Sequence, residues 1–152
     1  MNATPVNESA VPSLSNQNQA TAPALWNPEA AGGWSLIFNP VFGSILVLMN
    51  WQALGIKEKI RNSQIWLIVS IIMLVIGFFL PSPFGTVVTL SYLLIWYFAA
   101  AKPQAKYIKE RWGNTYPRKS WLWPLVIAIV ALMILYGSIF FIAFVQAMLS
   151  QQ

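Results

Sequence analysis

Three long stretches of the chain are apolar nearly throughout, and polar or helix-breaking residues separate them. They cover residues 65–80, 84–101 and 121–149. A helix needs about 20 mostly apolar residues to cross a bilayer. The twelve Leu, Ile, Val and Phe residues of the first stretch contribute about −4 to −7 kcal/mol on the insertion scale, so this stretch should enter a membrane unaided. The pattern therefore predicts three transmembrane helices.

The connections between these stretches refine the prediction. Pro81-Ser82-Pro83 separates the first two stretches, so they should form a tight helical hairpin. The third stretch would be about 43 Å long as a helix, against a hydrocarbon core of about 30 Å. It should therefore tilt or project from the membrane.

Residues 34–54 form a fourth apolar segment with two possible courses. The segment is long enough to span, but Asn39-Pro40 and Gly43 interrupt it. It either crosses as a kinked helix or turns back as a re-entrant element whose irregular backbone is shielded by protein. We favour the spanning helix, with a structural bend at Asn39, Pro40 and Gly43. We expect Asn50 to satisfy backbone groups that the bend frees.

Residues 1–30 are rich in Asn, Gln, Ser, Ala and Pro and lack a periodic apolar face. Such a composition buries too little surface to offset the entropy of ordering, so we expect a disordered tail. Residues 31–152 are then the folded domain. The predicted fold class is an all-α integral membrane bundle of three or four transmembrane helices, with a short interfacial helix near residues 103–112.

The distribution of charge predicts the topology. Only 9% of the 152 residues are charged, and all nine Lys and Arg residues fall within residues 57–61 and 102–119. Basic residues in short loops stay on the cytoplasmic side of a membrane. Both basic stretches should therefore be cytoplasmic, while residues 81–83 and the C-terminus should be external. The tail is external if residues 34–54 span, and cytoplasmic if they turn back.

The candidate site residues lie at this basic boundary, where side chains meet lipid headgroups. We expect contact with the membrane interface and with anionic lipids from Lys102, Lys106, Lys109, Arg111, Trp112, Arg118, Lys119, Trp121 and Trp123. Their charges are explained more simply by orientation of the protein than by a docking surface. Because no nucleic-acid-binding motif accompanies them, we expect no nucleic-acid partner.

Small residues recur at helical spacing in two of the apolar stretches. Gly85 and Thr89 form one pair, and Ala143 and Ala147 form the other. Such pairs let helices approach closely. We expect them to serve packing within the chain rather than oligomerisation.

The residue inventory argues against enzymatic chemistry. The chain has no Cys, His or Asp, so the commonest nucleophiles, bases and metal ligands are missing. An ion-coupled transporter normally carries an ionisable acid or base within the membrane, and the three apolar stretches contain no Asp, Glu, Lys, Arg or His. We predict a protein that is not an enzyme, with no catalytic, metal or cofactor-binding residues.

A set of short motifs accompanies the apolar pattern. Trp34-Ser35, the FNPVFG of residues 38–43 and the NWQALG of residues 50–55 precede the hairpin, and the second basic stretch ends in WGNTYPR at residues 112–118. The pattern resembles that of small bacterial inner-membrane proteins with W-S, F-x-P-x-F-G and N-W-x-A-L-G in the same order. The resemblance covers about residues 27–120. It implies a bacterial inner membrane and no particular activity.

These observations favour binding over catalysis. We expect a non-enzymatic membrane protein that binds a partner membrane protein, or a second copy of itself, in or beside the bilayer. An accessory subunit, or an immunity protein against a membrane-acting toxin, needs only a complementary surface. The alternative is a small oligomeric channel or transporter built around the Thr, Ser and Tyr side chains of residues 84–101.

The first prediction concerns membrane association. The protein should stay in the membrane fraction after washing with alkaline carbonate or high salt, because at least three segments bury apolar surface in lipid. Immunoblotting of the pellet and the supernatant measures this. Release into the supernatant would mean that only surface charges hold the protein to the membrane.

Overall fold

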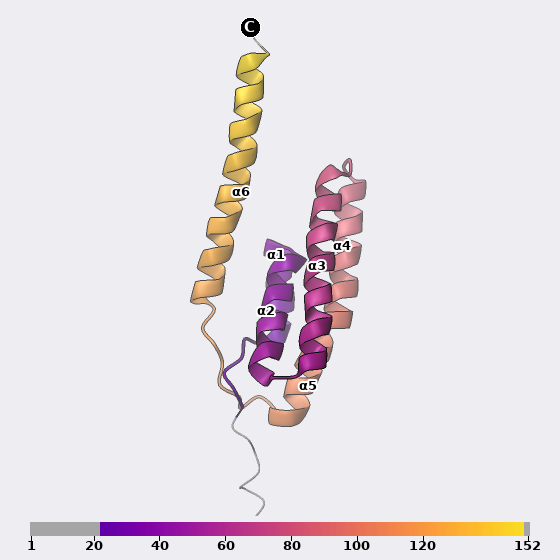
Figure 1. Cartoon of the computed structure of the whole chain (residues 1–152), viewed down its shortest axis with the longest axis vertical. Helices are drawn as coiled ribbons and strands as arrows, with labels where there is room; N and C mark the ends of the chain where they lie inside the picture. Colours follow the sequence, from indigo (N-terminus) through magenta and orange to yellow (C-terminus); the bar gives the residue numbers. More distant parts are fainter. Residues whose placement is uncertain (1–21, 151–152) are drawn as a thin grey trace, which may run out of the picture.

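The computed structural model describes residues 22–150. Its elements in chain order are α1 Pro28–Phe38, α2 Pro40–Leu54, α3 Lys57–Phe79, α4 Phe84–Trp96, the π-helical stretch η3 Tyr97–Ala101, α5 Lys102–Trp112 and α6 Leu122–Leu149 (Figure 1). Within this range, three helical segments are long and apolar enough to cross a membrane: Lys57–Phe79, Phe84–Trp112 and Leu122–Leu149. The predicted all-α membrane helical bundle is confirmed, and the chain is a multi-pass membrane protein.

Helices α3 and α4 form the long hairpin predicted from the apolar runs, and they lie side by side. Glycines allow this close approach: a Cβ on Gly85 would lie 2.8 Å from the carbonyl oxygen of Gly77. A Cβ on Gly77 would in turn lie 2.6 Å from Thr89 Oγ1. The expected use of Gly85 and Thr89 in packing within the chain is therefore confirmed.

Helices α1 and α2 form a second, shorter hairpin that turns at Asn39. The start of α1 and the end of α2 lie at the same end of the bundle. A hydrogen bond shows this: the backbone N–H of Trp26, just before α1, donates to Oδ1 of Asn50, near the end of α2, at 3.0 Å. The expectation of one kinked helix over residues 34–54 is therefore wrong, because the chain reverses direction at Asn39. Helix α2, with 15 residues, is about 22 Å long, shorter than a hydrocarbon core of about 30 Å.

The predicted disordered tail extends too far along the sequence. Residues 22–27 lead into α1 and pack on the fold: Leu25 is fully buried with Ile108 and Tyr116, and Asn27 caps α1 by accepting a hydrogen bond from the N–H of Glu29. The prediction is therefore wrong for residues 22–30. The reason is that Leu25 and Trp26 supply buried apolar surface within a polar composition. The rest of the predicted tail, residues 1–21, lies outside the described residues.

The expected basic helix is present as α5, but it does not start afresh at the membrane surface. It continues α4 through the π-helical turns of η3. The widened turns place Ala100 and Ala101 in the core, and Gln104 and Ile108 are buried on the same side of α5. A single helical segment thus joins the apolar span to the basic end.

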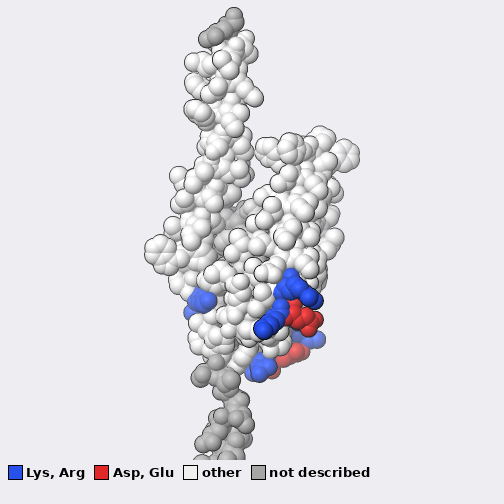
Figure 2. Space-filling view, viewed as in Figure 1, with Lys and Arg blue, Asp and Glu red and all other residues white. Residues whose placement is uncertain are grey.

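Helix α6 stands apart from the other helices over most of its length (Figure 1). Of its 28 residues, Ala128 alone is buried. The charged residues gather at the opposite end of the molecule from the C-terminus, near the start of α3 and around α5 (Figure 2). We call this end, which carries the Lys and Arg residues of 57–61 and 102–119, the basic end.

The fold yields a second prediction, on sidedness. Single cysteines at Ala24 and Asn114 should behave alike toward an impermeant thiol reagent in intact cells, both labelled or both protected. Cysteines at Ser82 and Ser150 should behave alike in the opposite way. The native chain has no Cys, so there is no background labelling. Ala24 tests the hairpin itself: if it reacted together with Ser82, residues 34–54 would cross the bilayer and the re-entrant arrangement would be wrong.

Candidate functional site

A buried amide pair connects three parts of the chain at the basic end. The Asn50 side chain is fully buried and binds the Trp26 backbone twice: Oδ1 accepts from the Trp26 N–H at 3.0 Å, and Nδ2 donates to the Trp26 carbonyl at 2.8 Å. Nδ2 also donates to Gln104 Oε1 at 3.1 Å. Gln104 Nε2 then donates to the Val47 carbonyl at 2.9 Å. The segment before α1, helix α2 and helix α5 are thereby fixed to one another.

A second polar cluster lies deeper, between α2, α3 and α4. Ser70 Oγ lies 2.8 Å from both Ser44 Oγ and Tyr92 Oη. Ser70 also donates to the Trp66 carbonyl at 2.8 Å. Ser44, Ser70 and Tyr92 are all buried, so these hydroxyl groups satisfy one another inside the protein rather than facing lipid.

The hairpin turn at Asn39 satisfies its own backbone. The Asn39 N–H donates to the Ser35 carbonyl at 3.0 Å, and its Oδ1 accepts from the N–H groups of Val41 and Phe42. Pro40 has no N–H to satisfy. Asn39 adopts φ 105° and ψ 163°, a backbone conformation that residues other than Gly rarely adopt. The bend predicted at Asn39 and Pro40 is thus a cap, and the expectation that Asn50 serves the bend is wrong.

Gly43 fits the hairpin into the bundle. A Cβ at this position would collide with Ser35 Oγ on α1 and with the ring of Trp96 at the end of α4. Gly43 therefore matters for contact between α1, α2 and α4, and it lies within α2 rather than in the bend itself.

The loop before α6 is clamped to the segment before α1. The Leu25 N–H donates to the Pro117 carbonyl at 3.0 Å, and the Lys119 N–H donates to the Leu25 carbonyl at 2.9 Å. Trp26 Nε1 donates to the Ser120 carbonyl at 3.1 Å, and the Lys119 ammonium lies 4.2 Å from the centre of the Trp26 ring. Lys119, a predicted interface residue, thus helps to hold the loop in place through its backbone N–H and its contact with Trp26.

The Tyr116 side chain packs into this clamp, and Arg118 lies over its ring with 5.7 Å between the guanidinium carbon and the ring centre. Burial raises the pKa of the Tyr116 phenol above its usual value, while the charge of Arg118 lowers the pKa and that of Glu29 raises it. The phenol therefore stays neutral at physiological pH.

The other predicted interface residues lie on α5 and at the start of α6. Lys102 lies over the Phe98 ring at 4.8 Å, Lys106 pairs with Glu110 at 3.7 Å, and Arg111 donates to Tyr107 Oη at 3.2 Å and lies over the Trp112 ring. Both members of the Lys106–Glu110 pair are largely exposed, so it contributes about 0–1 kcal/mol. Lys109 is exposed. These charged side chains lie on an exposed face, where Lys106 and Glu110 border a pocket of about 250 Å³.

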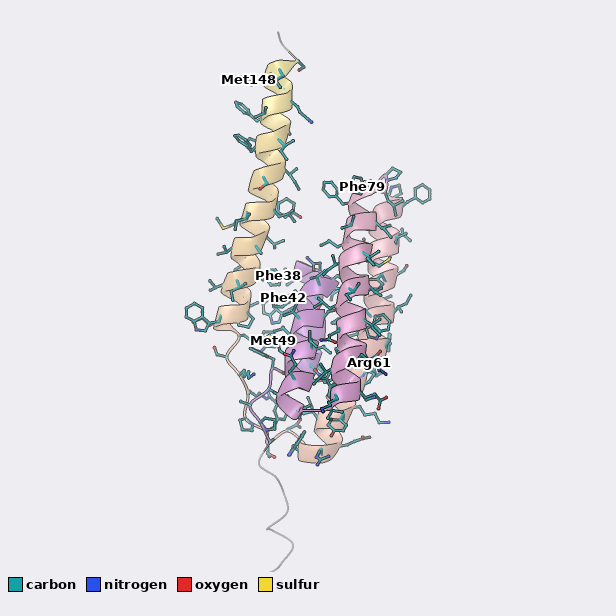
Figure 3. The ribbon with its side chains drawn as sticks, viewed as in Figure 1. Phe38, Phe42, Met49, Arg61, Phe79 and Met148 are labelled. Carbon is teal, nitrogen blue, oxygen red and sulfur yellow. The ribbon has the colours of Figure 1, made fainter. Side chains whose placement is uncertain are left out.

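Trp121 and Trp123 have different environments. Trp121 contacts the Trp34 ring on α1, with 6.4 Å between ring centres, and so attaches the base of α6 to the hairpin. Trp123 is 69% exposed and borders an apolar groove of about 490 Å³ between the α1–α2 hairpin and α6. Phe38, Phe42 and Met49 line the hairpin side of the groove (Figure 3).

The groove is the site that the sequence does not predict. Its walls come from segments about 80 residues apart: Phe38 to Met49 on one side and Trp123 to Leu135 on the other. The buried amide pair is also not predicted. Its only trace in the sequence is that Asn50 and Gln104 are amide residues within or beside apolar runs. The sequence does not show that they bind each other.

Comparison with known proteins adds no relative. No family model matches the chain, and neither a curated protein nor a solved structure matches it significantly.

A third prediction concerns the amide pair. Asn50→Ala leaves the Trp26 N–H and the Gln104 side chain short of partners in a buried place, so the protein in mild detergent should lose about 1–3 kcal/mol of stability. The midpoint of thermal unfolding should fall, and the reaction of a thiol reagent with a cysteine introduced at Ala31, which is fully buried in the folded protein, measures the transition. Asn62→Ala changes an exposed amide and is the matched control. An equal effect of the two substitutions would show that the buried bonds contribute little.

Proposed function

We propose that this protein acts without catalysis, as a bacterial inner-membrane protein that binds a partner membrane protein along α6. The resemblance to small bacterial inner-membrane proteins supports the location. The gathering of all basic residues at one end supports a cytoplasmic basic end. The re-entrant hairpin then leaves the N-terminal segment cytoplasmic and the C-terminus external.

The observation that carries the proposal is the isolation of α6. It has 28 residues and is about 42 Å long, and it touches the rest of the described chain near its base alone. Beyond the groove, Phe140, Phe141, Phe144 and Met148 are all more than half exposed. Apolar exposure is normal in lipid, but a transmembrane helix gains stability from helix packing that α6 lacks here.

Small residues on α6 support a helical partner. Ala143 and Ala147 are both exposed and lie one helical turn apart, a spacing that admits another helix at close range. No described part of the chain covers them. The pair at Gly85 and Thr89 is used in internal packing, so the two small-residue pairs differ, and the α6 pair suits contact between proteins.

The channel alternative has less support. It requires hydroxyl groups of α4 to line a path between copies, yet Tyr92 is buried and lies 2.8 Å from Ser70. Thr89 lies against Gly77 within the α3–α4 hairpin. An accessory subunit or a toxin-immunity protein needs only a surface, and α6 offers one.

Site-specific photo-crosslinking tests the proposal as a fourth prediction. A photoreactive amino acid at Phe144 should give a discrete adduct in the membrane of the native host, because the partner helix lies within contact distance. The same probe at Val75, an exposed position on α3, is the control and should give little adduct. Mass spectrometry of the adduct then identifies the partner.

Ala143→Leu combined with Ala147→Leu should reduce the Phe144 adduct, because larger side chains block close helix contact. If the crosslinked protein were a second copy of this chain, the protein would bind itself along α6. If the probe at Phe144 gave no adduct while the protein was present at normal levels, binding along α6 would be wrong.

A further inference from the structure

The apolar groove beside α6 is about as long as one leaflet of a bilayer is thick. On α6 its wall runs from Trp123 to Leu135, twelve residues apart, which is about 18 Å along a helix. A single leaflet contributes about 15 Å of hydrocarbon, half of the ~30 Å core. On the other side the wall ends at Asn39, the tip of the re-entrant hairpin. The groove is thus as deep as one lipid acyl chain, whereas a spanning partner helix would continue beyond it.

The lining of the groove suits hydrocarbon. Apart from Asn39, the residues that border it are apolar or aromatic, and they include Val41, Ile45, Leu74, Ile127 and Leu132. The hydroxyl clusters and the amide pair described above lie elsewhere, inside the bundle. The volume of about 490 Å³ falls in the range of about 300–1,000 Å³ found for small-molecule sites.

A cation lies at the basic end of the groove. Trp26 borders the groove, and the half-buried Lys119 lies over the Trp26 ring at 4.2 Å. Within residues 22–150, no carboxylate lies within 4.0 Å of the Lys119 ammonium. The loop that carries Lys119 is fixed by its backbone bond to Leu25. The Lys119 ammonium thus lies against Trp26, which borders the groove at the basic end.

We propose that the groove between the α1–α2 hairpin and α6 binds one anionic phospholipid from the leaflet at the basic end. An acyl chain occupies the apolar wall from Trp123 to Leu135, and Lys119 attracts the phosphate. The lipid fills the space that the short hairpin leaves beside α6. This site is separate from the partner surface at Phe140 to Met148, so it does not rest on the proposed function.

The test uses the full chain reconstituted in phosphatidylcholine vesicles that contain a trace of photoreactive lipid. One sample contains phosphatidylglycerol with a diazirine on the acyl chain, and the other contains phosphatidylcholine with the same chain. After illumination, peptide mapping locates the adducts. We expect adducts concentrated in residues 38–49 and 123–135, and more of them with phosphatidylglycerol.

Two pairs of variants separate the apolar and the ionic contributions. Ala131→Trp fills the groove and should remove most of the adduct there, while Met133→Trp, at the same depth on α6 but outside the groove lining, should leave the adduct unchanged. Lys119→Gln should lower the preference for phosphatidylglycerol about fivefold, the effect of one basic residue at an anionic surface. Lys57→Gln, at the basic end on α3, should not.

Several outcomes would overturn the proposal. Adducts spread evenly over the exposed faces of α3, α4 and α6 would indicate annular lipid alone. An adduct that survives Ala131→Trp, or an equal yield with both lipids, would also contradict it. A cysteine at Ala131 that forms a disulfide with its copy in another chain would show that a second copy occupies the groove. None of these results depends on whether Phe144 contacts a partner protein.

Discussion

The arrangement of this protein depends on the bonds that Asn50 makes to the backbone of Trp26. Hydrocarbon offers no hydrogen bonds, so a chain that enters a bilayer and turns back must satisfy its irregular backbone internally. Asn50 binds both the N–H and the carbonyl of Trp26, and it is itself bound by Gln104. These contacts hold the start of the α1–α2 hairpin against its end, and they attach both to the helix that continues α4.

The tip of the hairpin solves the same problem with one residue. Asn39 ends α1 through its N–H and begins α2 through its side chain. The next residue, Pro40, removes a donor that would otherwise need a partner. Both ends of the hairpin therefore have backbone polar groups satisfied within the protein.

The sequence predicts the parts of this fold in which every position faces the same solvent. The apolar runs within α3, α4 and α6 are evident because lipid requires apolar side chains along a whole span. The hairpin is different, since Asn39-Pro40 fits both a kink and a turn. The choice between them depends on a contact between Trp26 and Asn50, 24 residues apart. Leu25 is missed for a similar reason: its neighbours are polar, and its burial comes from Ile108 and Tyr116.

The unequal lengths of the helices explain why α6 differs from the rest. Helices α3 and α4 pack along each other through Gly77 and Gly85, but the hairpin beside α6 ends at Asn39. The base of α6 is held by the loop bonded to Leu25 and by the contact of Trp121 with Trp34. Above Leu135 nothing in the described chain faces α6. The shortness of the α1–α2 hairpin therefore also creates the groove and leaves the C-terminal half of α6 uncovered by the described chain.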